Sequence, residues 1–362
     1  MIKRAALSLL FAMVVSLPPA AQTDGTRQVW EQGWAAIQSG DGERAASIFR
    51  QALEFHPSEG LLHFGAGIAS HVLGREDDAV RSLKRALELS PRLTDAAKLL
   101  GEIQYSAGDV DDAIRSYEQA VGQRPGDLEM RERLDAWRKE SSVHRGLTQR
   151  NDGRFSIVFE GRTDSELADR AVASLDAAYW RIGKAIGAYP SNSITVTLYT
   201  EQQFRDLTRA PEWSSGIFDG RIRIPVKGAR QNLQQFDRVL AHELTHAMVT
   251  NLAPRGVPAW LHEGLASYFE PQDTASAVKV LSATGPVPVG VLLDSFSRLN
   301  ERQATAAYAE SLLLAEVLMR RAGTRMGIVL QGLDRGQTLQ DSLQLVGIGV
   351  GDLESDLMKR FK

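Results

Sequence analysis

The chain has 362 residues, enough for two or three domains, and its 43% hydrophobic and 24% charged residues are typical of soluble globular proteins. A formal net charge of -3 argues against a general affinity for nucleic acid or for an anionic membrane. The sequence contains no cysteine, which excludes disulfides, thiol catalysis and thiolate metal sites. Any zinc site must therefore be built from histidine and carboxylate side chains.

The N-terminus has the pattern of a secretory signal peptide over residues 1–21. Lys3 and Arg4 precede an apolar run over residues 5–17, and small residues follow over 18–21. The run is too short to cross a bilayer as a helix. We therefore expect an exported, soluble protein, periplasmic or secreted, with no stable membrane insertion after cleavage. A short membrane anchor is the alternative.

An internal repeat with a period of 34 residues follows over residues 26–127. The positions that keep this spacing are Gly33, Gly67 and Gly101; Gly40, Gly74 and Gly108; Ala45, Ala79 and Ala113; Ala52, Ala86 and Ala120; and Pro57, Pro91 and Pro125. Small residues let two helices pack closely, glycine ends the first helix of each pair, and proline stops the second. The pattern resembles the tetratricopeptide repeat. That resemblance implies an all-α solenoid of three repeats plus a capping helix over residues 26–142, binding a protein partner or substrate.

Beyond the repeats, a polar stretch over residues 141–152 is expected to link two domains. Two strands are predicted, over residues 155–159 and 194–199, because apolar and polar residues alternate there or β-branched residues are frequent. A helix is predicted between them, over residues 164–186. Residues 217–225 predict a hairpin around an Asp-Gly turn, whose second arm we expect to be a half-exposed edge strand. A peptide could add to that edge over residues 221–224, and an ordinary solvated edge strand is the alternative. Strands followed by helices predict an α+β domain with a small sheet.

The segment from His242 to His246 reads His-Glu-Leu-Thr-His within an uninterrupted helical pattern. On a helix His242 and His246 lie one turn apart on the same face, so both imidazoles can bind one ion. Glu243 is placed to take a proton from a water that the ion activates. The alternative is a helix with two partly buried histidines and a solvated glutamate, and the five residues alone leave both open.

A second predicted helix, over residues 259–269, can supply a third ligand, Glu263. A zinc hydrolase needs three protein ligands and one open position for water. Gly264 beside this ligand would let the second helix and the His242 helix approach closely. His262 precedes Glu263 and could replace it as a ligand, but neighbours on a helix point about 100° apart, so we expect this histidine to be exposed or to lie at the rim.

The sequence resembles the gluzincin metallopeptidases of the peptidase MA type in two motifs. The first is His-Glu-x-x-His, and the second, after a short turn containing proline, is Trp-Leu-x-Glu-Gly-Leu-Ala. In particular it is similar to small bacterial domains joined to tetratricopeptide repeats. The resemblance covers residues 154–362 and implies a zincin-like fold, with the sheet and zinc helices over 154–270 and helices over 271–362. The expected architecture is therefore multidomain: an all-α repeat solenoid followed by an α+β domain with a helical C-terminal part.

Carried over residue by residue, the resemblance implies one zinc ion per chain with His242, His246 and Glu263 as ligands. Glu243 matches the general base. Tyr308 matches a tyrosine that these domains carry near the start of a helix beside the site, and is a candidate donor to the developing oxyanion. The alternative for Tyr308 is a packing role.

Two departures from related peptidases limit what the resemblance implies. Thermolysin-like relatives have an aspartate one turn after the ligand glutamate, where this chain has Ser267, so no partner for the ligand histidines can be named. The Gly-x-Met-Glu-Asn motif of related aminopeptidases is absent, which favours an endopeptidase. Tyr268 is a weaker candidate donor that we expect in the core.

These patterns predict an exported zinc metallopeptidase whose repeats recruit a protein substrate or partner. The alternative is a non-catalytic binding or assembly factor with a vestigial or structural zinc site, against which the intact Glu243 argues. A metal-dependent hydrolase of a non-peptide substrate is a third candidate, because the ligands fix the chemistry and not the substrate.

Overall fold

The structure is a computed structural model that describes residues 24–161, 165–190, 193–208, 216–254, 256–270, 274–287, 292–293, 296 and 299–359. The expected signal peptide, residues 1–21, lies outside the described residues. The described chain divides into two compact units, one ending at Arg145 and the other beginning at Gly146. No helix in the described ranges combines the length and the apolar character needed to span a membrane.

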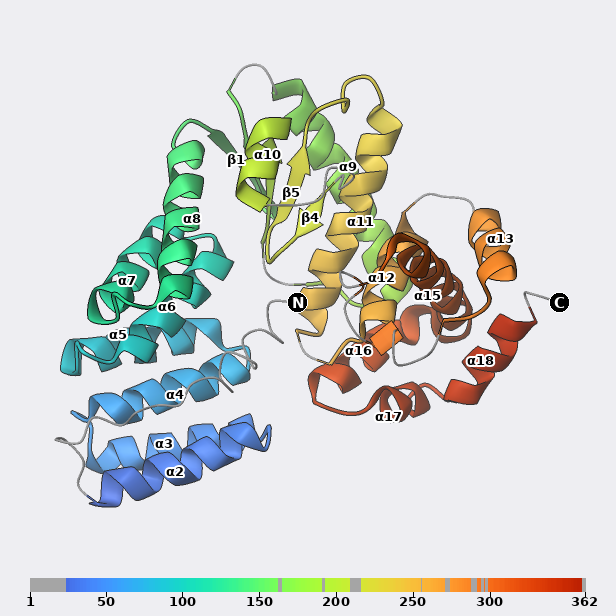
Figure 1. The fold of residues 1–362 in the computed structure, drawn as a ribbon. Helices are drawn as coiled ribbons and strands as arrows, with labels where there is room; N and C mark the ends of the chain where they lie inside the picture. Colours follow the sequence, from blue (N-terminus) through green and yellow to red (C-terminus); the bar gives the residue numbers. More distant parts are fainter. Residues whose placement is uncertain are drawn as a thin grey trace. The chain divides into compact units, whose positions relative to one another are not determined.

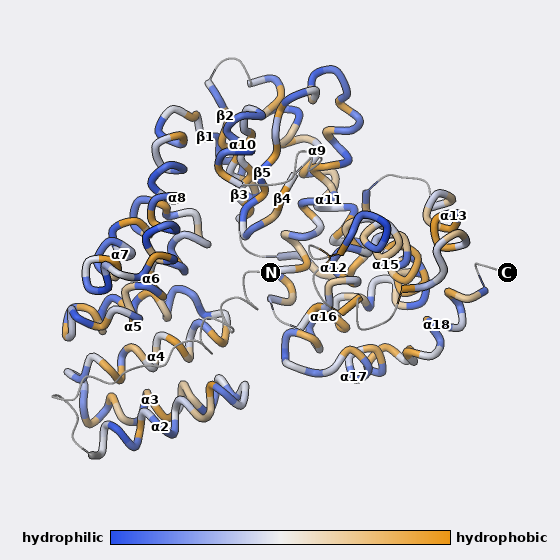
Figure 2. Tube along the Cα trace, viewed as in Figure 1, coloured by the Kyte–Doolittle hydropathy of each residue, from blue (hydrophilic) through white to orange (hydrophobic). Residues whose placement is uncertain are grey.

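The first unit is an array of helices (Figure 1). They are α2 (Asp24–Gln38), α3 (Gly42–Phe55), α4 (Gly60–Val72), α5 (Glu76–Leu89), α6 (Thr94–Ala107), α7 (Val110–Gln123) and α8 (Leu128–His144). Gly40, Gly74 and Gly108 follow the first helix of each pair with φ of 79°, 71° and 95°, the left-handed conformation that ends a helix. Figure 2 shows hydrophobic and hydrophilic residues mixed along each helix, as expected for amphipathic packing. The repeat solenoid is confirmed.

The second unit contains a five-stranded sheet with the strand order β1-β2-β3-β5-β4. Its strands are β1 (Thr148–Asp152), β2 (Phe155–Phe159), β3 (Ile194–Tyr199), β4 (Ile217–Phe218) and β5 (Ile222–Pro225). β2, β3 and β5 run parallel, and β1 and β4 are antiparallel additions at the two ends. β1 lies within the stretch that we expected to be a linker, because its polar sequence and almost complete exposure give no hydrophobic alternation.

The expectation that residues 221–224 form a half-exposed edge is wrong. β5 pairs with β3 on one side and with β4 on the other. Arg223 is 2% exposed, and its guanidinium donates to Asp219 at 3.0 Å and to the Tyr199 hydroxyl at 3.1 Å. The alternation of Ile and Arg therefore reflects two buried faces of the strand, one apolar and one polar, and Arg223 on the polar face is paired.

Helices pack on the sheet and extend the unit toward its C-terminus. They are α9 (Ser165–Ile186), α10 (Glu201–Thr208), α11 (Leu233–Leu252), α12 (Ala259–Phe269), α13 (Ala275–Thr284), α15 (Glu301–Ala322), α16 (Met326–Asp334), α17 (Leu339–Gln344) and α18 (Val350–Met358), with a 3-10 turn at Gly323–Arg325. Ile157, Val196 and Ile224 of the sheet belong to the same core as α9 and α11. The predicted α+β fold with a helical C-terminal part is confirmed.

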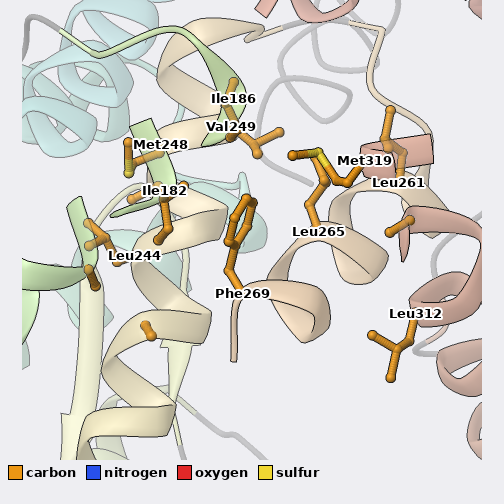
Figure 3. Close-up of a cluster of buried hydrophobic side chains, with 14 of the residues drawn as sticks. Ile182, Ile186, Leu244, Met248, Val249, Leu261, Leu265, Phe269, Leu312 and Met319 are labelled. Carbon is orange, nitrogen blue, oxygen red and sulfur yellow. The ribbon is translucent and has the colours of Figure 1, made fainter. Parts of the chain in front are cut away.

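The two helices predicted to carry the metal ligands, α11 and α12, share one apolar core. Leu244, Met248 and Val249 of α11 gather with Leu265 and Phe269 of α12, as Figure 3 shows. Since all five are 3% exposed or less, the relative position of the two helices is fixed by close packing.

Gly264 does not face α11, contrary to our expectation. A Cβ at this position would lie against the carbonyl oxygen of Ser311 and 3.0 Å from the Ala315 side chain, both on α15. The glycine therefore allows α12 to approach α15, which is the helix that carries Tyr308.

Candidate metal centre

α11 presents its motif residues because its other face is apolar. Asn232 caps its N-terminus, where the side-chain oxygen accepts a hydrogen bond from the Gln235 amide at 2.9 Å. Leu240 and Leu244 are fully buried in the core of the unit. The half-buried His242 and His246 then lie together on the remaining face, with their rings 4.9 Å apart.

α12 begins directly after Pro258, which lies in extended conformation before the first helical turn. Trp260, Leu261 and Leu265 bury its apolar face, and Glu263 is left half-buried toward α11. The Arg181 side chain of α9 donates to the Phe269 carbonyl at 2.9 Å and so satisfies the C-terminal end of α12. The position of Glu263 is thus set by a helix held at both its apolar face and its end.

His242, His246 and Glu263 come together as a possible metal-binding group. The Nε2 atoms of His242 and His246 are 3.2 Å apart, and the Oε2 atom of Glu263 lies 3.5 Å from His246 Nε2 and 4.0 Å from His242 Nε2. A zinc ion bound tetrahedrally at about 2.0–2.2 Å keeps its ligand atoms about 3.3–3.6 Å apart. Two imidazoles and one carboxylate are also a common donor set for catalytic zinc, so these residues fit the ion.

The charges of this group favour metal binding. Burial opposes ionisation of Glu263, but His246 and His242 outweigh it and lower the pKa of the carboxyl to about 2. Glu263 is therefore a carboxylate at neutral pH. A carboxyl group must be deprotonated to bind a metal ion, and Glu263 meets this condition.

His242 has an orienting partner that the sequence did not reveal. Its Nδ1 atom lies 3.3 Å from Oε2 of Glu270, and Arg238 donates to the other oxygen of Glu270 at 2.8 Å. Burial opposes the charged form of Glu270, yet hydrogen bonding to His242 and the charge of Arg238 hold the pKa of Glu270 below its usual range. A carboxylate on the second nitrogen fixes the ring and leaves Nε2 for the metal.

The sequence does not reveal the role of Glu270 because of where this residue stands on the chain. The position one turn after Glu263, where the resemblance led us to look for a carboxylate, is the buried Ser267. Glu270 is the residue at the C-terminal end of α12, nearly two turns after Glu263. Only the packing of α12 on α11 brings it to His242.

The expectation that His262 is an exposed rim residue is wrong. Its side chain is half-buried between α11 and α12, and its ring lies beside that of His246, with the two ring centroids 5.0 Å apart. Burial, and then the neighbouring His246, lower the pKa of His262 to about 3. His262 is therefore a neutral imidazole in contact with a predicted ligand.

Glu243, the predicted general base, is only 7% exposed and lies on α11 between the two histidines. Burial raises the pKa of its carboxyl above the usual value, although His242 and His246 oppose the shift. A raised pKa makes a carboxylate a stronger base, which suits a group that must accept a proton.

Tyr308 of α15 lies near the same carboxylates. Burial, and then the charges of Glu263 and Glu243, raise the pKa of its phenol. Its ring packs edge-on against Phe296 at 5.3 Å, and within the described ranges no hydrogen bond engages its hydroxyl.

Tyr268, the weaker candidate donor, was expected in the core. It is instead 37% exposed, so that expectation is wrong.

A family model of the Peptidase MA superfamily matches residues 174–361, just over half of the 362 residues. The chain belongs to the Peptidase MA superfamily. The Peptidase MA match contains all of the residues that form the candidate metal centre. Tetratricopeptide-repeat models match residues 31–93 and 73–128, within the helical array of the first unit. The predicted combination of repeats and a peptidase MA-like domain is thus confirmed.

Curated relatives match this Peptidase MA chain only in part. The small glutamine-rich tetratricopeptide repeat-containing protein 2 of Mycosarcoma maydis is 24% identical over 115 residues, 32% of this chain and 33% of that protein. The STIP1 homologue of Dictyostelium discoideum is 28% identical over 104 residues, 29% of this chain and 18% of that protein. The chain thus spans a third or less of these relatives. Among solved structures, the P58(IPK) TPR domain aligns at 12% identity and a TM-score of 0.33, covering 93% of this chain and 77% of that one.

Proposed function

We propose that the protein is a zinc metallopeptidase, with Glu243 as the general base and endopeptidase cleavage of a protein substrate. The observation that carries the proposal is the convergence of His242, His246 and Glu263, with Glu243 buried beside them. Zinc bound there would polarise a peptide carbonyl and lower the pKa of water. Membership of the Peptidase MA superfamily supports this chemistry.

The chain's own residues then divide the remaining work. The carboxylate of Glu243 would accept a proton from the attacking water and pass it to the leaving amine. Arg238 and Glu270 would hold His242 in place, since they form a continuous chain of hydrogen bonds to its Nδ1 atom. A purely structural metal site has no use for a buried base, so Glu243 favours an enzyme over a binding factor.

Gly216, the residue before β4, lies directly beside the general base. A Cβ at Gly216 would lie 3.0 Å from Cγ of Glu243 and 2.9 Å from side-chain atoms of Val239 and Ile224. β4 follows as the last strand of the described sheet, so its outer side would let an extended peptide pair with it beside Glu243. This edge replaces the one that we expected at β5.

Gly216→Val is expected to lower kcat by about 100-fold, because the added side chain would displace Glu243 from the attacking water. Zinc content should stay at the wild-type level. Steady-state kinetics on a cleaved peptide, with metal analysis of the same sample, would check this. An unchanged kcat would mean that the close approach of Gly216 does not position the base.

Tyr308→Phe is expected to lower kcat by about 100-fold or more, because its hydroxyl would donate to the oxygen that gains charge in the transition state. The packing on Phe296 is kept in this variant, so the melting temperature should hardly change. Kinetics and thermal unfolding measured together would separate the two roles. Full activity in Tyr308→Phe would leave packing as the only role of this tyrosine.

We further propose that the repeats bind a protein substrate or partner and that the protein is exported. Tetratricopeptide repeats over residues 31–128 support the first proposal. The signal-like sequence of residues 1–21 supports the second. N-terminal sequencing of the protein recovered outside the cytoplasm would test export, since uncleaved Met1 in all of the protein would contradict it.

A proteome-wide cleavage experiment tests the proposed activity. Protein extracts would be incubated with the full-length wild type or with Glu243→Gln, and new peptide termini identified by mass spectrometry. We expect termini that appear only with the wild type and vanish with a zinc chelator. No new terminus in any extract, despite bound zinc, would favour a binding factor or a hydrolase of non-peptide substrates.

A further inference from the structure

We propose that His262 is a positioning residue that fixes the tautomer of the metal ligand His246. It would do so through a relay of hydrogen bonds from His246 through His262 to Thr250. The proposal rests on the zinc site proposed above. It assigns to His262 a role that neither its place beside Glu263 nor its sequence context predicts.

The geometry of the relay is direct. Nδ1 of His246 lies 2.8 Å from Nδ1 of His262, and Nε2 of His262 lies 3.2 Å from the Thr250 hydroxyl. The two ring planes are inclined by only 28° and their centroids lie 5.0 Å apart, so the rings meet edge to edge with the two Nδ1 atoms facing each other. Both nitrogens of His262 are therefore engaged, one by His246 and one by Thr250, and His262 is not a member of the metal-binding group.

Counting protons gives the relay its direction. Nε2 of His246 must carry a lone pair to bind a cation, so its Nδ1 must carry the proton. At 2.8 Å only one proton fits between two ring nitrogens, so His262 accepts at Nδ1 and carries its own proton on Nε2. That proton points to Thr250, whose hydroxyl oxygen can accept it.

The reverse direction would be incompatible with metal binding. If Thr250 donated to Nε2 of His262, then Nδ1 of His262 would donate to His246. The proton of His246 would then sit on Nε2, where it blocks the lone pair. His262 thus prepares the ligand by offering an acceptor at a fixed place.

The elements that hold the relay make it rigid. His246 and Thr250 lie one turn apart on α11, and His262 reaches both from α12. The same helix α12 carries the ligand Glu263 and leads into Glu270, the partner of His242. One helix therefore supplies a ligand and the orienting groups of the two other ligands.

Zinc affinity of the full-length protein tests the assignment without any need for a substrate. The dissociation constant would be measured by competition with a chromophoric chelator for the wild type, His262→Ala, His262→Asn, Thr250→Val and the control His56→Ala, an exposed histidine of the repeats. We expect His262→Ala to bind zinc about 10–100-fold more weakly. Asn should restore most of the affinity, because its amide oxygen can accept from Nδ1 of His246.

A second measurement reports the tautomer itself. In zinc-loaded protein labelled with ¹⁵N at histidine, we expect a slowly exchanging Nδ1 proton on His246 that is lost in His262→Ala.

In the affinity measurement, Thr250→Val should weaken zinc binding severalfold, and His56→Ala should match the wild type. Thermal unfolding of the metal-free variants would show that each still folds.

The outcomes separate this assignment from the proposed function. Equal zinc affinity of the wild type and His262→Ala, or an unchanged His246 proton signal, would overturn the positioning role alone. His262→Asn binding as weakly as His262→Ala would overturn it also, by pointing to a ligand rather than an acceptor. A wild type that binds no zinc would overturn the proposed function and this assignment together.

Discussion

Glu243→Gln is expected to lower kcat by about 1,000-fold while zinc stays bound, since a general base contributes about 10²–10⁴-fold. Glutamine keeps the shape of the side chain in a site where only 7% of the glutamate is exposed, but its amide cannot accept the water's proton. Metal analysis and single-turnover kinetics on one cleaved peptide would measure both effects.

The control for this variant is Glu354→Gln, which makes the same chemical change on an exposed residue of α18. It should keep wild-type activity and zinc content. Wild-type turnover by Glu243→Gln would show that another group takes the proton, and the proposed mechanism would then be wrong.

Gly264→Val is expected to destabilise the second unit by about 3 kcal/mol, because overpacking of a close helix contact costs about 1–3 kcal/mol and the nearest atom here is backbone. The new side chain would meet the carbonyl of Ser311, which no change of rotamer on α15 can move away. The melting temperature should fall by about 6–12 °C. Zinc affinity should fall too, since Glu263 is the preceding residue of α12.

Gly351→Ala serves as the matched control, because a Cβ on this glycine of α18 would meet no atom within 4 Å. It should leave the melting temperature unchanged or slightly raise it. If Gly264→Val had the same melting temperature as this control, the close approach of α12 and α15 would not be needed for stability.

Local patterns made most of the fold predictable. The spacing of Gly40, Gly74 and Gly108 predicted helix ends because a left-handed residue is a local requirement, and all three have positive φ. The strand over Phe155–Phe159 was predictable because its alternation matches its alternating burial. β1 was missed because an exposed end strand made of polar residues carries no such pattern.

Spacing within one helix predicts part of the candidate site, and the resemblance to the gluzincin peptidases adds Glu263 on a second helix. His242, Glu243 and His246 are placed by the helical turn alone. The partners Glu270 and His262 depend on how α12 packs against α11, and a residue's neighbours in sequence do not reveal this. The angle between adjacent helical residues predicts that His262 and Glu263 point in different directions, but it could not show which side chain His262 meets.

The zinc content of the full-length chain is the measurement that tests the central claim most directly. Protein purified from cells supplied with zinc, and analysed by inductively coupled plasma mass spectrometry, is expected to hold one zinc ion per chain. His246→Ala and Glu263→Ala should lose the ion, whereas His56→Ala should retain it. A wild type without zinc, or triad variants that retain it in full, would contradict the account.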